Sequence, residues 1–377
     1  MNILVITTRN LYENSGEYNL MAAKDKVLKS KNINLLYYSF RRSFLQPKPE
    51  NLNILKQEST YSILLNRKKI IANIVAFIKN YDVKIIVLSG GWIFILHKEL
   101  ANIKREYGIS FSFDYQGAIE EIVEYKVVKN SIVLSYILYK TLRYYENIVI
   151  NMSDGVEVVS QNCLQHIKKI YRTDTRQEGV VVSCGIEYPV KESKYKEYRS
   201  YWRDKYNIAT DDIACVYAGG IAKWQNVDEI IEKCKNQSAI KLYIFTSLKN
   251  QELIKKKYDL SSNIYFDYLS HAELSEALCA FDYGFLLRNE DITNYVAFPN
   301  KYSDYINARL QVVVKNKKIG YYPVEEERES LIQNISKPLK KSKIKQDDIY
   351  NRYIEDLSYT SMVKNLVKYY QKLSKEK

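Results

Sequence analysis

The sequence is poor in the residues that mark several classes of protein. Its 377 residues include only twelve glycines, six prolines, five cysteines and three histidines. The cysteines are odd in number, widely spaced and mostly within apolar runs, so we expect reduced core residues rather than a disulfide framework. No histidine has a carboxylate or cysteine at the spacing of metal ligands, and we therefore predict no metal centre.

Long apolar runs and hydrolase motifs are also missing. No stretch approaches the ~20 apolar residues that a helix needs to cross a bilayer. Residues 1–7 show no basic leader or cleavage site and are interpreted as a core strand, so we expect a cytoplasmic protein. The Gly-x-Ser-x-Gly pattern of nucleophilic hydrolases is absent, as are internal repeats.

Acidic residues are fewer than basic ones. The net charge is +13, from 57 basic and 44 acidic residues, and the excess is spread almost evenly along the chain. A nucleic-acid-binding domain would concentrate this charge, so we expect no nucleic-acid partner. An even excess instead favours anionic small ligands or an anionic membrane surface.

The length and the hydrophobic pattern predict two α/β domains, each with its own core. Short apolar runs rich in β-branched and aromatic residues alternate with longer amphipathic stretches, as in βα units around parallel sheets. The predicted strands form two sets, at 3–6, 33–38, 85–88, 109–113, 156–160 and 180–183, and at 213–218, 240–245, 264–266, 283–287 and 311–314.

We predict an amino-terminal domain at residues 1–187, a second domain at 188–355 and a C-terminal helix at 356–377. The polar, charge-dense segment 187–212 has no strand pattern and marks the junction. Apolar residues recur every three to four positions in the last segment, so this helix should pack on an existing domain. Two doubly wound domains would direct the loops after their strands to a shared cleft, where ligands of such sheets bind.

The most informative segment is 294–306, where Lys301 and Asp304 stand one helical turn apart after Pro299. In a helix that begins near Pro299, both side chains share a face with the first-turn N–H groups. This face suits a phosphorylated ligand with hydroxyl groups, because the amides and Lys301 can bind phosphate while Asp304 binds sugar hydroxyls. Taken alone, the pattern also fits an ordinary capped surface helix.

Two other segments follow predicted strands of the second domain. Gly219 and Gly220 would let the backbone approach a ligand closely, and Lys223 can then reach a pyrophosphate. Arg288 ends a strand and should emerge at the carboxyl edge of the sheet, where binding residues gather. The alternatives are a packing turn with a solvated lysine and an arginine that caps a helix.

The first domain should supply the acceptor side. A β-rich run ends at Asp114, whose carboxylate would project from the sheet edge and orient an acceptor or donor hydroxyl. In the loop at 7–18, Arg9 and Gly16 are candidates to contact ligand, although a mobile surface loop explains them nearly as well. Residues 89–92 also follow a strand and can line the cleft.

The segment 125–145 combines many apolar residues with Lys126, Lys129, Lys140 and Arg143, and has no acid. One hypothesis is that it lies on an anionic bilayer with its basic residues at the headgroups. The other is a partly buried helix with a solvated basic face. A lipid-linked acceptor would make the membrane contact functional.

In their order and spacing, five motifs resemble the GT-B glycosyltransferases, and among them family 4, whose nucleotide-sugar enzymes build bacterial surface polysaccharides. The motifs lie at 154–160, 180–186, 216–225, 281–288 and 294–306. The resemblance extends over nearly the whole chain and implies two Rossmann-like domains facing a central cleft, with the donor in the second domain.

The resemblance also implies roles for single residues. Lys223 stands at the family's basic position, and His271 falls in the loop that holds the nucleotide base through its backbone. Two positions depart from the family pattern. Gly220 stands about where the family has an arginine, and Val296 replaces the first of two glutamates eight positions apart, of which Asp304 fits the second.

We therefore expect Arg288 to compensate for the missing arginine and the backbone of 294–296 to replace the missing carboxylate. The predicted catalytic residues are Asp114, Lys223 and Arg288, and the predicted donor-binding residues are Gly16, Gly219, Gly220, His271, Asn294, Tyr295, Val296, Lys301 and Asp304.

The resulting hypothesis is a glycosyltransferase that moves a sugar from a nucleotide diphosphate sugar to a growing surface glycan, lipid-linked or not, at the inner face of the cell membrane. By resemblance it needs no metal or other cofactor and retains the anomeric configuration. The alternatives are a nucleotide-sugar epimerase of the same architecture and a non-catalytic subunit that binds nucleotide-sugar or a partner. No convincing acid-base pair supports the epimerase, and a silent subunit would be expected to lose Lys301 and Asp304.

Overall fold

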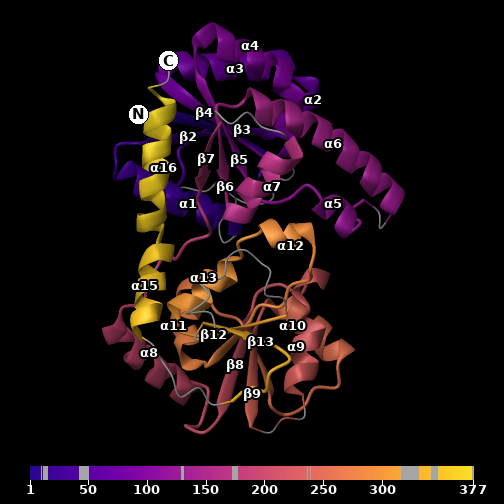
Figure 1. The fold of residues 1–377 in the computed structure, drawn as a ribbon, viewed down its shortest axis with the longest axis vertical. Helices are drawn as coiled ribbons and strands as arrows, with labels where there is room; N and C mark the ends of the chain where they lie inside the picture. The colour runs from indigo at the N-terminus through magenta and orange to yellow at the C-terminus, as the bar shows by residue number, and fades with distance from the viewer. Residues whose placement is uncertain are drawn as a thin grey trace. The chain divides into compact units, whose positions relative to one another are not determined.

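The computed structural model describes residues 1–9, 11, 16–41, 51–128, 131–171, 177–235, 237, 239–315, 331–340 and 347–375. The chain forms two compact units (Figure 1). Unit 1 comprises Met1–Ser183, Asp291–Ala297 and Tyr359–Lys377, and unit 2 comprises Cys184–Glu290 and Phe298–Ser358.

Unit 1 is built on a parallel sheet with the strand order β3-β2-β1-β4-β5-β6-β7. Its strands are β1 (Asn2–Thr7), β2 (Asn34–Arg41), β3 (Ile54–Ser59), β4 (Val83–Ser89), β5 (Ser110–Tyr115), β6 (Gly155–Val158) and β7 (Glu178–Val181). The inner strands are nearly continuous apolar runs because helices cover both faces of a parallel sheet. All six predicted strands are present, and β3 is an edge strand that the sequence did not predict.

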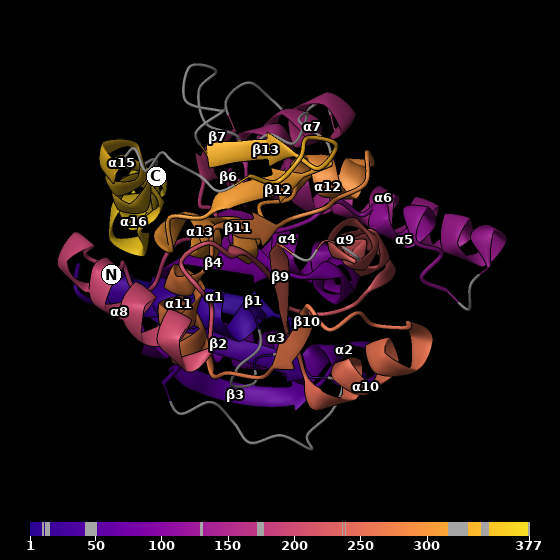
Figure 2. The same ribbon diagram turned by 90° about the horizontal axis from the view of Figure 1, so that it is seen from below.

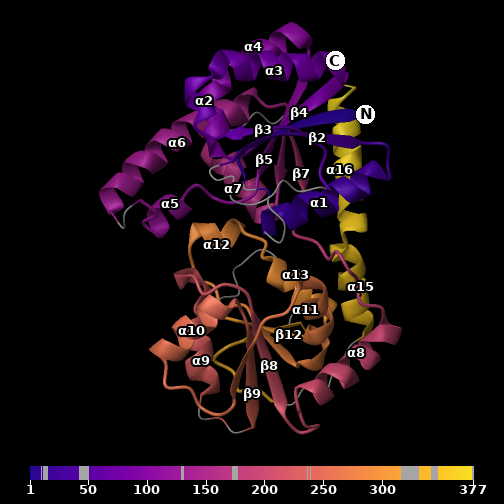
Figure 3. The same cartoon turned by 180° about the vertical axis from the view of Figure 1, so that it is seen from behind.

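The helices of unit 1 are α1 (Gly16–Lys29), α2 (Ser62–Leu65), α3 (Arg67–Asn80), η1 (Gly91–Leu96), α4 (His97–Tyr107), α5 (Glu121–Glu124), α6 (Ile132–Met152), α7 (Gln161–Tyr171), α12 (Ile292–Val296) and α16 (Tyr359–Leu373). The C-terminal helix packs back on a domain, as predicted: α16 lies beside α1 (Figure 3) and buries Val363 and Leu366 against the β1 residues Ile3 and Val5.

Unit 2 has a second parallel sheet with the strand order β10-β9-β8-β11-β12-β13 (Figure 2). Its elements are β8 (Ile213–Ala218), β9 (Ile240–Phe245), β10 (Ile264–Asp267), β11 (Tyr283–Phe285), β12 (Gln311–Val314), β13 (Ile332–Asn334), α8 (Glu192–Lys205), η2 (Lys223–Gln225), α9 (Val227–Cys234), α10 (Leu248–Lys257), α11 (His271–Ala277), η3 (Leu278–Ala280), α13 (Asn300–Asn307) and α15 (Asp347–Leu357). Helices α8, α11 and α13 contribute to the core on one face, and α9 and α10 to the core on the other. The five predicted strands are present, and β13 was not predicted.

The unit boundaries differ from the predicted domains in one important place. The change from unit 1 to unit 2 falls between Ser183 and Cys184, close to the predicted junction, and the return falls at Tyr359. The difference is Asp291–Ala297, which was assigned to the second domain but packs with unit 1. Its contacts with α5 and α7 explain this assignment and are described below.

Each sheet reverses its strand order at one place, and ligands of doubly wound sheets bind at the carboxyl ends of the strands there. In unit 1 this switch point lies between β1 and β4, and in unit 2 between β8 and β11. The loops after these four strands therefore define the two places where functional residues are expected. None of the five cysteines forms a disulfide, and four of them are buried.

Candidate active site

At the switch point of unit 2, Gly219 follows β8 and contacts the side chain of Lys301. Gly219 has φ +131°, and a Cβ there would lie 2.5 Å from Cε of Lys301. Residue 219 therefore has to be a glycine because the Lys301 side chain lies against it. The sequence had suggested only the approach of a ligand as the reason. Gly220 is different, because a Cβ there would meet open space.

Lys301 lies in the first turn of α13, whose N-cap is Pro299, so the predicted helix and its start are confirmed. Its ammonium donates to Tyr217 Oη and to Gln225 Oε1, both at 2.8 Å, and lies 4.2 Å from the centre of the Tyr217 ring. Burial, together with the nearby Arg288, holds the pKa of Lys301 well below its usual value, and Asp304 opposes this shift only in part.

Arg288 follows β11 and is partly buried beside this lysine. Its Nε is buried and has no hydrogen-bond partner within the described part of the chain. A buried donor without a partner is costly unless a ligand satisfies it. Two neighbouring cations, one with an unpaired donor, make this end of the sheet suitable for an anion such as a diphosphate.

Asp304 stands one turn after Lys301 on α13 and is partly buried. Burial raises its pKa to about 6, and the charges of His271 and Lys301 work against that rise. His271 is the exposed first residue of α11 and directly follows the N-cap Ser270, which forms a capping box with Glu273. The structure therefore brings Asp304, His271, Lys301 and Arg288 into one electrostatic cluster.

Lys223 begins η2 and is exposed. Gln225, at the end of η2, accepts a hydrogen bond from Lys301, so the loop after β8 reaches the cluster. Sequence reasoning missed Tyr217 and Gln225, the two direct partners of Lys301. The only sequence feature that points to them is their position at and after the end of β8.

The predicted donor residues Asn294, Tyr295 and Val296 lie on α12, which packs with unit 1, whereas the residues of the cluster belong to unit 2. The N–H of Asn294 donates to Asp291 Oδ1 at 2.7 Å, and the N–H of Tyr295 donates to the Asp291 carbonyl at 2.9 Å. The N–H groups of Asn294 and Tyr295 are therefore already bonded to Asp291. They are not free to contact a donor, as the expected replacement of the missing carboxylate would need.

Helix α12 is held by α5 through residues that the sequence did not single out. The Glu124 carboxylate accepts hydrogen bonds from the backbone N–H groups of Ile292 at 2.9 Å and Thr293 at 3.1 Å. Tyr125 Oη donates to the Asp291 carboxylate and accepts a bond from Asn294 Nδ2 at 3.1 Å. Two carboxylates, those of the N-cap Asp291 and of Glu124, thus accept hydrogen bonds from the first N–H groups of α12.

Helix α7 and the residue before it hold the other end of α12. Ser160 Oγ donates to the carbonyl of Val296 at 2.6 Å, and Asn162 Nδ2 donates to the carbonyl of Tyr295 at 3.0 Å. With both ends bound to unit 1, the segment 291–297 belongs to that unit by its contacts and not by its position in the chain.

At the switch point of unit 1, Asp114 ends a chain of hydrogen bonds that starts at Arg9. Arg9 Nε donates to Ser89 Oγ at 2.7 Å, and Ser89 Oγ donates to Asp114 Oδ2 at 2.9 Å. Gln116 Nε2 donates to the same carboxylate oxygen at 2.9 Å. Asp114 is the last residue but one of β5, and it is buried.

A pocket of about 360 Å³ adjoins Asp114, and we call it the polar pocket. Arg9, Gln116 and Glu146 also line it. Glu146 is buried and accepts a hydrogen bond from Tyr171 Oη, and burial raises its pKa to about 8. Carboxyl, amide and guanidinium groups around one small pocket are suited to a ligand with several hydroxyl groups.

Two predicted features lie partly outside the described residues. Gly16 begins α1, but most of the loop before it is not described, so the structure does not test a ligand contact there. Lys129 of the basic segment also falls outside the described residues. In the described part of the chain, no helix is long and apolar enough to span a bilayer. The same part contains no group of three or more His, Cys, Asp or Glu side chains placed to hold a metal ion.

No protein-family model matches the sequence, and a search of curated proteins finds no match. Solved structures do match over almost their full lengths. Sucrose-phosphate synthase from Thermosynechococcus elongatus has a TM-score of 0.69 at 11% identity, covering 99% of both chains. A glycosyltransferase from Rickettsia africae ESF-5 has a TM-score of 0.66 at 14% identity, covering 100% of this chain and 99% of that one.

A third similar structure is HepE of Anabaena in complex with UDP and glucose, with a TM-score of 0.59 at 11% identity, covering 99% of this chain and 98% of the other. Identities this low show a shared fold. The two parallel sheets of the present chain, each with a Rossmann-like switch point, match that fold over both units. The chain therefore has the GT-B fold, which the sequence motifs had resembled.

Proposed function

We propose that the protein is a glycosyltransferase that moves a sugar from a nucleotide diphosphate sugar to a glycan acceptor. The observation that carries this proposal is the cluster at the switch point of unit 2. Lys301 and Arg288 place two basic groups together, and the pKa of Lys301 lies well below its ordinary value. The Nε of Arg288 is buried and has no hydrogen-bond partner among the described residues. A bound diphosphate would supply the missing negative charge and the missing acceptor.

The chemistry follows from where negative charge develops. When the bond between the sugar and the diphosphate breaks, the leaving diphosphate gains charge, and cations fixed beside it stabilise the transition state. Lys301 and Arg288 are assigned this role, with Lys223 reaching the pyrophosphate from the loop after β8. Asp304 accepts from ribose hydroxyls, and the backbone at His271 holds the base.

Asp114 is assigned to the acceptor side. Its burial and its bonds from Ser89 and Gln116 fix the carboxylate in one orientation, and this kind of positioning lowers the barrier by aligning a hydroxyl for attack. As further parts of the proposal, the acceptor is a bacterial surface glycan, the anomeric configuration is retained, no metal is required, and the reaction takes place at the inner face of the cell membrane.

Thermal stabilisation by a panel of nucleotide sugars tests the donor site. We expect one or a few donors to raise the unfolding temperature of the wild type and to lose this effect in Lys301→Ala. The matched control is Lys249→Ala, because Lys249 is an exposed lysine on α10 of the same unit. If no donor stabilises the wild type, or if both variants respond like it, the donor site is not where we place it.

The same panel separates the alternatives. Slow donor hydrolysis without an acceptor supports a transferase. A change in the donor's sugar with no release of nucleotide would instead identify an epimerase. Binding without either reaction, also in the presence of acceptors, would identify a non-catalytic subunit.

A further inference from the structure

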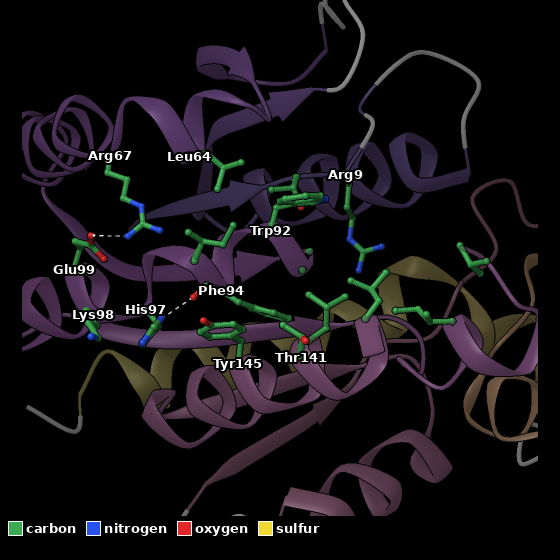
Figure 4. A pocket seen from close by; sticks show the side chains of 18 residues that line it. Arg9, Leu64, Arg67, Trp92, Phe94, His97, Lys98, Glu99, Thr141 and Tyr145 are labelled. Atoms are coloured by element: carbon green, nitrogen blue, oxygen red, sulfur yellow. Dashed lines mark hydrogen bonds and ion pairs between the residues drawn. The ribbon is translucent and has the colours of Figure 1, made fainter. Parts of the chain in front are cut away.

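Unit 1 contains a groove of about 900 Å³ beside the polar pocket (Figure 4). This apolar groove lies within the size range of about 300–1,000 Å³ that is usual for small-molecule sites. Its walls are mostly apolar side chains from α2, η1, α5 and α6, among them Leu64, Trp92, Phe94, Ile122, Leu138 and Leu142. Figure 4 shows Leu64 and Trp92 on one side of the groove and the α6 residues Thr141 and Tyr145 on the other.

The apolar groove and the polar pocket are continuous. They share Arg9, Gly90, Phe94, Ile122 and Leu142 as lining residues. A ligand with a hydroxyl-bearing end beside Asp114 can therefore extend an apolar part directly into the groove. Polar side chains of Arg67, His97, Lys98, Glu99 and Thr141 also line the groove, but most of its exposed wall is apolar, so an apolar chain gains more there from leaving water than a glycan does.

The surface around the groove is also apolar. On α2, Leu64 and Leu65 are 49% and 80% exposed, and on α6 Val133 and Ile137 are 64% and 56% exposed. Exposed apolar residues that occur singly need no explanation, but a contiguous group on elements that flank a groove marks an interaction site. These two helices are the walls of the groove, so its rim offers apolar surface as well.

The charges around α6 indicate what kind of surface this site meets. Residues 125–145 contain no acidic side chain. Lys126 and Lys140 are exposed, the latter on α6 itself. An apolar face flanked by basic residues complements the boundary between acyl chains and anionic headgroups.

We propose that the apolar groove holds the hydrocarbon chain of a lipid-linked acceptor, whose sugar end lies in the polar pocket at Asp114. This inference rests on the proposed function and names the substrate class of its acceptor half. The apolar walls bind the chain by removing it from water, while the exposed residues of α2 and α6 border the lipid surface from which the chain enters.

Alkyl β-D-glucosides of increasing chain length, kept below their micelle concentrations, test this proposal on the full chain by calorimetry. We expect the affinity to rise about fourfold for each added methylene that is buried. Leu138→Asp places a charge in the groove wall and should abolish this dependence, and Leu64→Asp should do so from the opposite wall. Both residues are more than one third exposed, so the variants are expected to fold.

Ile137→Asp is the matched control, because Ile137 is the neighbouring residue on α6, is exposed and does not line the groove. We expect this variant to keep the chain-length dependence while it weakens binding to vesicles that contain anionic lipid. An affinity that does not change with chain length overturns the proposal. So does an equal loss in Ile137→Asp and Leu138→Asp, because it would show surface adhesion instead of binding in the groove.

Nucleotide-sugar binding in the same samples keeps the two proposals apart. Donor binding without chain-length dependence overturns the groove proposal alone. Chain-length dependence without any donor binding overturns the proposed function, and with it the role of the groove ligand as an acceptor.

Discussion

Gly219 and Lys301 are in direct contact, since a Cβ on residue 219 would come within 2.5 Å of Cε and 2.8 Å of Nζ of the lysine. The first residue follows β8 and the second lies on α13, so two distant parts of the chain define one position of the ammonium. The same ammonium is held by Tyr217 and Gln225. The turn at Gly219 therefore helps to fix the position of the lysine that we propose to bind phosphate, and a change in the turn should also move the lysine.

Gly219→Ala should displace Lys301 and strain the backbone. Residue 219 has φ +131°, which is unfavourable for alanine and costs on the order of 1–3 kcal/mol. We expect a lower unfolding temperature together with weaker binding of nucleoside diphosphate. Gly220→Ala is the matched control, because its Cβ would meet open space. Equal effects of the two substitutions would show that the contact with Lys301 is unimportant.

Lys301→Ala should weaken nucleoside diphosphate binding by roughly ten- to a hundredfold, since a hydrogen bond to a charged group contributes about 1.5–3 kcal/mol. Calorimetry measures this directly, with Lys249→Ala as the control. Unchanged affinity in Lys301→Ala would remove this lysine from the donor site.

The lowered pKa of Lys301 predicts that donor binding takes up a proton. Burial and Arg288 lower the pKa of the free protein, and a bound diphosphate would raise it again. Binding should therefore weaken as the pH rises through the pKa of the free lysine. Calorimetry in buffers of different ionisation enthalpy measures the proton uptake in that range. Its absence there would mean that Lys301 does not face the phosphates.

Asp304→Asn should stabilise the fold near neutral pH while it weakens nucleotide binding. The pKa of Asp304 is raised to about 6, so the folded protein binds more protons than the unfolded chain between the ordinary aspartate pKa and that value. Wild-type stability is accordingly lost as the pH rises through this window. Above it the variant should be more stable by about 1–3 kcal/mol, and below it the two should converge.

The ligand side of this prediction uses ribo- and 2′-deoxynucleotides. If Asp304 accepts from the ribose hydroxyls, wild type should prefer the ribonucleotide and Asp304→Asn should lose most of that preference. The same preference in both proteins would show that Asp304 does not bind the ribose, whatever its effect on stability.

Glu124→Gln should loosen α12. The Glu124 carboxylate accepts from the N–H groups of Ile292 and Thr293, and a neutral amide makes weaker bonds there, with an expected cost of about 1–3 kcal/mol. Hydrogen exchange of the α12 amides should become faster, while exchange in the β1 and β4 core stays unchanged. Unaltered exchange in α12 would show that the Glu124 carboxylate is not needed and that Tyr125, Asp291 and the contacts with α7 are enough to hold this helix.

Local sequence patterns predicted those features that depend on local geometry. The eleven expected strands are present because runs of β-branched and aromatic residues form the interiors of parallel sheets. The missed strand β3 reads Ile-Leu-Lys-Gln-Glu-Ser and is only partly buried at the sheet edge, so it lacks an apolar pattern. Lys301 and Asp304 were found for the same local reason, since one helical turn fixes their shared face.

The remaining parts of the site depend on contacts between distant residues. Lys301 and Gln225 are 76 positions apart, and Glu124 and Thr293 are 169 apart. No pattern around Glu124 distinguishes it from its neighbour Glu121, so its role in holding α12 could not be predicted from the sequence. For the same reason the sequence pattern placed 291–297 in the second domain, whereas the contacts of Asp291–Ala297 group it with unit 1.

Asp114→Asn tests the division of labour between the two units. Asp114 belongs to unit 1, whereas Lys301 and Asp304 belong to unit 2, so the substitution should leave most nucleotide affinity intact. The amide can still accept from Ser89 and Gln116 but has lost the charge that orients an acceptor hydroxyl, so transfer should fall while donor binding remains. This is the pattern of a residue that acts chiefly in the transition state.

The measurement compares transfer, donor hydrolysis and nucleotide affinity in wild type and Asp114→Asn. Ser89→Ala is the companion variant, since Ser89 lies between Arg9 and Asp114 and only positions the carboxylate, so it should have a smaller effect on transfer. Wild-type transfer by Asp114→Asn would contradict the assignment. The acceptor hydroxyl would then have to be oriented by another group of the polar pocket, and Glu146, with its pKa raised to about 8, would be the next residue to replace.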